Sequence, residues 1–189
     1  MLTMVSGGSD NGTVRILRVF VVLVLSVHLL SCSGDDEFSG ELEKRPDTVS
    51  WDFRQVNVDG NRRVIAEAEK VEVFDDQDLT VFTQARLQEY DEGGDLLREG
   101  SAEEIRIVGE NEGSAAGNIV VRDIAEDATM NAEALNWSDE ERTLTGDGPV
   151  DITGADGLSV SGSGFVADLA RDSYRYADGA TGVVIADDE

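Results

Sequence analysis

Residues 79–90 read LTVFTQARLQEY, and apolar and polar side chains alternate along most of this stretch. Side chains that recur at every second residue lie on one face of a β-strand, whereas a helix would scatter them around its axis. The stretch therefore predicts a half-buried strand. One face would carry Leu79, Val81, Ala85 and Leu87, and the other Thr80, Gln84, Arg86 and Gln88.

Similar patterns occur on both sides of this strand. Upstream, one apolar run begins at Trp51 and a second at Arg63. Downstream, we expect strands near 96–108, 116–124, 128–137, 142–153, 157–168 and 172–185. Turn formers such as Gly93-Gly94 and Asp178-Gly179 separate them, and these residues adopt positive φ at little cost. No stretch after residue 32 predicts a helix of ordinary length, so we expect an almost all-β domain of mostly antiparallel strands.

Composition excludes several classes of function. The formal net charge is −25, and such a surface repels nucleic acid and does not suit a polybasic membrane binder. The single histidine, His28, and the single cysteine, Cys32, both lie near the N-terminus. The rest of the chain therefore cannot form a Ser-His-Asp or Cys-His nucleophile, or a zinc site of the usual kind. Carboxylate chemistry and the binding of hard metals through oxygen remain.

The N-terminal segment predicts an export signal. Arg15 and Arg18 precede the apolar run Val19–Leu30. As a helix this run would rise roughly 18 Å, which is too short for a bilayer core of about 30 Å but suits a signal peptide. The run ends in Leu-Leu-Ser-Cys at 29–32, which resembles the lipobox of bacterial lipoproteins. In those proteins the signal is cut before the cysteine, and its sulfur receives a diacylglyceryl group.

Acylation would also explain the lone cysteine of an exported chain, because secreted proteins use cysteines in pairs. The alternatives are an ordinary signal peptide with an incidental cysteine and a short uncleaved membrane helix. We therefore expect three parts: a signal peptide at 1–31, the lipidated Cys32 with a flexible acidic tether at 32–48, and a β domain at 49–189.

Two later segments carry a family resemblance. Residues 130–152, MNAEALNWSDEERTLTGDGPVDI, predict a strand that ends in a tryptophan, a tight turn at 138–141 and a returning strand. Residues 158–168, LSVSGSGFVAD, follow with a Gly-x-Gly-aromatic-x-Ala-Asp pattern. In this order they resemble the LptC family, the periplasmic component of the lipopolysaccharide-export ABC transporter. Trp51 and the Ala-Glu-Lys-Val stretch at 68–71 extend the likeness over about residues 49–185.

The resemblance implies an open, twisted antiparallel β-jellyroll shaped like a folded sheet, with no enzymatic activity, catalytic residue, cofactor or metal. Family members hold the acyl chains of lipopolysaccharide in an apolar interior. They also dock edge to edge, by strand addition, with an LptA-like bridge protein and with the jellyrolls of the inner-membrane transporter. The expected groove residues are Val71, Val73, Leu79, Val81, Ile105, Ile107, Ile119, Val121, Met130, Leu144, Val150, Ile152, Leu158, Val160 and Phe165.

The expected anchor departs from the family pattern, in which an uncleaved transmembrane helix is usual. We expect a domain that faces the periplasm from the inner membrane, with the outer membrane as the alternative because Ser33 follows the cysteine. Two other functions stay open. A structural or calcium-binding β-lipoprotein could use Asp147, Asp151 and Asp156, and a glycan hydrolase could use two of the 40 acidic residues.

Overall fold

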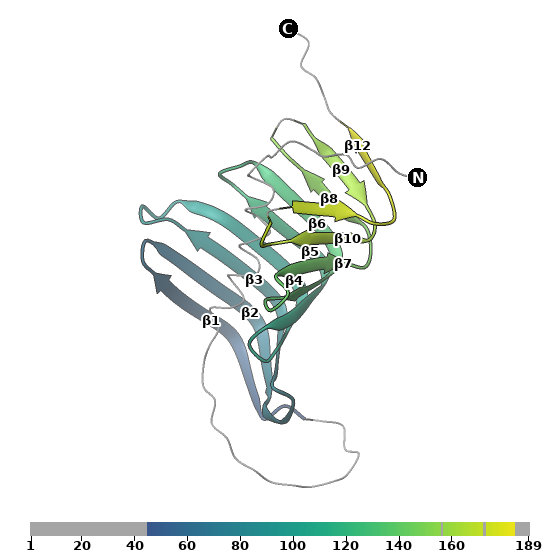
Figure 1. Ribbon diagram of the computed structural model, residues 1–189. Helices are drawn as coiled ribbons and strands as arrows, with labels where there is room; N and C mark the ends of the chain where they lie inside the picture. The colour runs from purple at the N-terminus through teal and green to yellow at the C-terminus, as the bar shows by residue number, and fades with distance from the viewer. Residues whose placement is uncertain (1–44, 156, 172, 184–189) are drawn as a thin grey trace.

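The computed structural model describes residues 45–155, 157–171 and 173–183, which form one 12-stranded antiparallel sheet (Figure 1). The expected all-β antiparallel fold is confirmed. The signal segment and Cys32 lie outside the described residues. The six long strands are β1 (Thr48–Asp59), β2 (Arg62–Phe74), β3 (Leu79–Tyr90), β4 (Leu96–Val108), β5 (Glu112–Asp123) and β6 (Ala128–Ser138). A 3-10 turn at Asp75–Gln77 joins β2 to β3.

Six strands of four residues follow the long ones: β7 (Thr143–Gly146), β8 (Val150–Thr153), β9 (Ser159–Gly162), β10 (Phe165–Asp168), β11 (Ser173–Tyr176) and β12 (Ala180–Val183). The long strands pair in chain order, and Figure 1 shows them side by side. At β6 the sheet divides. The C-terminal half of β6 pairs with β7 and leads to β10 and β11, whereas its N-terminal half pairs with β8 and leads to β9 and β12.

The sheet therefore has two wings. The first wing contains β7, β10, β11 and the adjoining halves of the long strands, at 48–51, 70–74, 79–83, 104–108, 112–116 and 134–138. The second wing contains β8, β9, β12 and the other halves, at 53–59, 62–68, 85–90, 96–102, 119–123 and 128–132. Both wings contribute to one apolar core, and the face that carries this core is called the inner face below.

A crease separates the wings. Asp52, Gln84 and Asn118, on alternate strands, have φ of 52°, 53° and 46°, which is unusual within a strand for residues other than glycine. The strand registers place Asp52 and Gln84 on either side of Glu69 in β2, so these positions form a line across the strands. At Asn118, with Gly117 beside it, β5 contains an extra residue relative to both neighbours.

The crease shifts the alternation of side chains by one position. In β3 the core contains Phe82 and then Ala85 and Leu87, so two residues separate the inward side chains where the strand bends. The same step separates Ala68 from Val71, Ala102 from Ile105, and Ala132 from Leu135. Without it, one wing would turn its apolar side chains to solvent.

The expectation that Leu79, Val81, Ala85 and Leu87 share one face was therefore wrong. Ala85 and Leu87 are inward, but Val81 is opposite Glu72 and Arg106 on the outer face, and Leu79 shares that face. Val81 is nevertheless buried. The positive φ of Gln84 causes the change of face, and nothing in the residue types signals it.

Three expected strands were also too long. The stretches 142–153, 157–168 and 172–185 each contain two short strands that lie on different wings, so the chain crosses the crease between them. Gly148 and Pro149 lie between the two strands of the first stretch, and positive φ at Gly164 and Gly179 allows the other two crossings.

Replacing Gln84 by valine is expected to lower the free energy of unfolding by about 1–2 kcal/mol, because a β-branched side chain is disfavoured at positive φ. Gln84 is exposed, so lost packing would not explain such an effect. Urea unfolding followed by tryptophan fluorescence measures it. Gln88→Val, on the same strand at ordinary φ, is the control, and equal losses in both variants would contradict a role for the crease.

Candidate functional site

The candidate site is the inner face between the wings. Nine expected groove residues belong to its buried core: Val71, Ile105, Ile119, Val121, Met130, Leu144, Val150, Ile152 and Phe165. Val73 and Ile107 are half-buried and pack against this core. Val160 is opposite Ile152 in the strand register, so it shares the inner face, and Leu158 is half-buried just before β9. Leu79 and Val81 lie on the outer face, so the structure brings 12 of the 15 expected residues to the inner face, with Leu158 next to them in the chain.

The packing of the inner face changes along the sheet. Near the division at β6 it is dense: Leu135, Leu144, Val150 and Phe165 are fully buried. Tyr176 in β11 closes this end, since its hydroxyl donates a hydrogen bond of 3.2 Å to the carbonyl of Val150 on the other wing. Burial raises the pKa of this hydroxyl, so Tyr176 stays a donor.

Toward β1 the side chains are smaller or less buried. Alanines lie at positions 66, 68, 85 and 102, and Phe53 and Val64 are only partly buried. Phe53 meets Phe82 edge to face, with ring centroids 5.9 Å apart. An apolar guest would therefore find its looser surroundings at the β1 end, because small side chains leave room that branched ones would fill.

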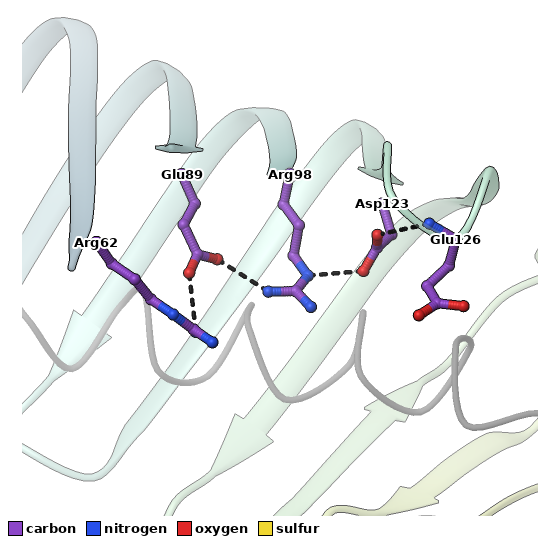
Figure 2. A network of polar contacts seen from close by, with 5 residues as sticks. All are labelled: Arg62, Glu89, Arg98, Asp123 and Glu126. Carbon is purple, nitrogen blue, oxygen red and sulfur yellow. Dashed lines mark hydrogen bonds and ion pairs between the residues drawn. The ribbon is translucent and has the colours of Figure 1, made fainter. Parts of the chain in front are cut away.

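A row of charged residues crosses the inner face at the tip of the second wing (Figure 2). Arg62 donates to Glu89 at 2.9 Å, and Arg98 donates to the other oxygen of Glu89 at 3.1 Å. Arg98 Nε also donates to Asp123 at 2.7 Å, and the backbone N–H of Glu126 donates to Asp123 at 3.1 Å. The row, called the charged lip below, joins the β1–β2, β3–β4 and β5–β6 hairpins.

The positions of these residues follow from the strand alternation. Glu89 continues the inward series of Ala85 and Leu87, and Asp123 continues that of Ile119 and Val121. Both carboxylates are buried. Partial burial acts to lower the pKa of Arg98, but its hydrogen bonds and attraction to Asp123 and Glu89 outweigh this, so the pKa is raised. Sequence reasoning missed this row; the available signal was a charge at an inward position of an alternating strand.

The crease contains a recess of about 730 Å³. Its lining includes the exposed crease residues Glu69, Gln84, Glu103 and Asn118, together with the apolar residues Phe53, Ala68, Ala85 and Ala102. Arg54 and Glu67, joined by an ion pair of 3.0 Å, border it on the second wing. The mixture of charges gives the recess no clear preference for one kind of ligand.

The β1 edge is the long edge of the described sheet, where β1 pairs only with β2. Its outer face exposes Val49, Trp51, Val56 and Val58, and the Trp51 side chain, 65% exposed, contacts the Lys70 ammonium 5.7 Å from its ring. An edge strand has unpaired backbone N–H and C=O groups, so it is a ready surface for the addition of another strand.

Within the described part of the chain, no group of three or more histidine, cysteine or acidic side chains is arranged to hold a metal ion. Asp147 accepts a hydrogen bond from Asn136 at 3.3 Å. Asp156 lies outside the described residues. No helix within 45–155, 157–171 and 173–183 is long and apolar enough to cross a membrane.

Comparisons with known proteins agree with this architecture. LptH of Pseudomonas aeruginosa, the LptA homologous periplasmic component of the conserved lipopolysaccharide transport device, superposes with a TM-score of 0.52. The match covers 65% of this chain and 95% of that chain at 9% identity, so it shows a shared fold. No curated protein matches the sequence. The sequence model described as lipopolysaccharide-assembly, LptC-related, matches residues 16–182, and the chain therefore belongs to the LptC family.

Proposed function

We propose that this chain is a non-enzymatic carrier that holds the acyl chains of lipopolysaccharide between its two wings during transport across the periplasm. Membership of the LptC family supports the pathway. The observation that carries the proposal is the apolar inner face, to which both wings contribute and which is loosest near a free edge. Each CH₂ group that it removes from water would contribute about 0.8 kcal/mol, so acyl chains would be held without covalent chemistry or a cofactor.

A crosslinking experiment tests the carrier role. A photo-crosslinking residue in place of Ile107, which faces the interior, is expected to capture lipopolysaccharide in cells. The same residue at the neighbouring Val108, 47% exposed and on the outer face, is expected to capture none. Blotting for lipopolysaccharide on the purified protein measures both. Equal capture at the two positions, or none at Ile107 in a folded and abundant protein, would contradict the proposal.

The free edge supports a second part of the proposal, that an LptA-like bridge protein or a transporter jellyroll adds a strand to β1. The long edge offers main-chain hydrogen bonds, and the exposed side chains of Val56 and Val58 offer apolar contact.

A photo-crosslinker at Val56 is expected to capture a purified LptA-like bridge protein, because that side chain lies on the outer face of the edge strand. Val108 is again the control, since it is similarly exposed but belongs to the interior strand β4. Gel shift and mass spectrometry identify the adduct. Capture at Val108 and not at Val56 would place the contact elsewhere.

We also propose that Cys32 anchors the domain by its acyl groups to a membrane, with the inner membrane preferred, and that residues 32–48 act as a tether. The sequence of the lipobox-like stretch and the lone cysteine support this.

Cys32→Ser is expected to abolish incorporation of radiolabelled palmitate in a bacterial host, because serine has no sulfur to receive the diacylglyceryl group. Autoradiography of the purified chain measures the label, and Ser31→Ala serves as a control that keeps the acceptor. Label retained in Cys32→Ser would contradict the anchor. Sucrose-gradient separation of inner and outer membranes would then show where the wild-type chain resides.

A further inference from the structure

We infer that the charged lip receives the anionic group, a phosphate or a carboxylate, of the lipid whose acyl chains lie between the wings. This inference rests on the proposed function and adds the chemistry of the headgroup and the side of the groove on which it lies. Four observations support it: the position of the row, the exposure of its members, its difference from the other ion pairs, and the asymmetry of the two wing tips.

The position of the lip places charge at the boundary of the apolar interior. Glu89 and Arg98 are direct cross-strand partners, and so are Arg98 and Asp123, so the row runs across the strands along the tip of the second wing. Figure 2 shows the side chains projecting from the same side of these strands. A headgroup that slides along the groove axis would therefore remain beside the row.

In the charged lip the arginine side chains are more exposed than the carboxylates, so positive charge is accessible to a ligand. The side chains of Glu89 and Asp123 are 4% and 0% exposed, whereas those of Arg62 and Arg98 are 58% and 13% exposed. Each carboxylate oxygen already accepts a hydrogen bond. Each guanidinium has five N–H donors, and the contacts of the row use only some of them. The carboxylates thus fix the orientation of the two arginines, which remain able to donate to an anion.

The other ion pairs of the long strands are more exposed than the buried carboxylates of the lip. The side chains of Lys70–Glu72 are 27% and 23% exposed, and those of Arg54–Glu67, Arg106–Glu104 and Arg122–Glu99 are at least 31% exposed on both partners. Pairs of that kind contribute little to stability. Burying the carboxylates of Glu89 and Asp123 has a desolvation cost that an ion pair does not always offset. A contribution to stability therefore explains the charged lip poorly. Recognition of an anion by planar, pre-oriented guanidinium groups is a use that fits its geometry.

The two wing tips differ in the chemistry of their inner faces. On the first wing, Val73, Ile107 and Trp137 bring apolar surface close to the hairpins. On the second wing, the charged lip occupies the corresponding place. An amphiphile between them would be oriented, with its anionic group toward the second wing. The net charge of −25 means that the field of the whole protein repels anions. Binding of an anionic headgroup therefore requires local arginines such as those of the lip.

The test uses the full chain in nanodiscs of neutral phosphatidylcholine, with a photo-crosslinker at Ile107 to report occupancy. Half-saturating concentrations are compared for lipid A with both phosphates, for the same lipid A without phosphates, and for lipid A in which uronic acids replace the phosphates. We expect wild type to bind either anionic form at least tenfold more tightly than the neutral form. Arg62→Gln is expected to reduce this preference at least threefold.

Arg54→Gln is the matched control, since Arg54 is 56% exposed and paired with a glutamate but lies on the outer face. It should keep the full preference. Arg98→Gln should remove most of the preference for the anionic lipids. That substitution also breaks a buried hydrogen-bond network, so if the Arg98→Gln protein does not fold, the result for Arg62→Gln decides the test. A wild type without headgroup preference, or a preference that survives Arg62→Gln, would overturn the inference while leaving the carrier proposal intact.

Failure of all three lipids to crosslink in wild type would instead remove the carrier proposal, and the inference with it. Competition by inorganic phosphate is the last measurement, because the same guanidinium groups could bind the free anion. Millimolar phosphate should compete weakly with the anionic lipids. If low-millimolar phosphate abolished the preference for the anionic lipids completely, the lip would be a site for free anions, and the inference that it binds a lipid headgroup would be overturned.

Discussion

Each long strand has to keep its apolar side chains on one side of a sheet that bends through the middle. A strand with strict alternation cannot do this once the backbone turns, because a shift of one residue sends every later side chain to the other face. The protein meets this constraint at the crease, where Asp52, Gln84 and Asn118 adopt positive φ. The common core, the division at β6 and the direction of the charged lip all depend on that step.

The crease also decides how the short strands are connected. Since the wings diverge beyond β6, a strand after it can follow only one of them, and the chain crosses from one wing to the other three times between β7 and β12. Phe165 and Tyr174, which both belong to the first wing, pack with ring centroids 5.9 Å apart, and Tyr176 then reaches across to Val150. The dense end of the interior is thus built by the C-terminal strands, while the long strands form the looser end.

Much of this architecture could be predicted from sequence. Alternation gave the positions of the long strands, with 96–108 correct at both ends, and the order of the Trp, Gly-x-Gly and Ala-Asp pieces indicated the family. The crease could not be predicted, because glutamine is an ordinary strand residue and its type does not indicate the positive φ that Gln84 adopts. The spacing of Ala68 and Val71, three positions apart instead of two or four, was the feature of the sequence that indicated a change of face. The charged lip was missed because Glu89 and Arg98 become meaningful only once they are seen as cross-strand partners.

The division at β6 gives the described sheet two unlike ends. At one end a single strand, β1, extends over both wings, so one added strand there would also hold the wings at a fixed angle. At the other end the wings finish separately, in β11 and β12, which are four residues each. These ends are not copies of each other, so a contact between them would be head to tail rather than two-fold symmetric. A chain of such domains would therefore have a direction, as a conduit that moves its cargo one way requires.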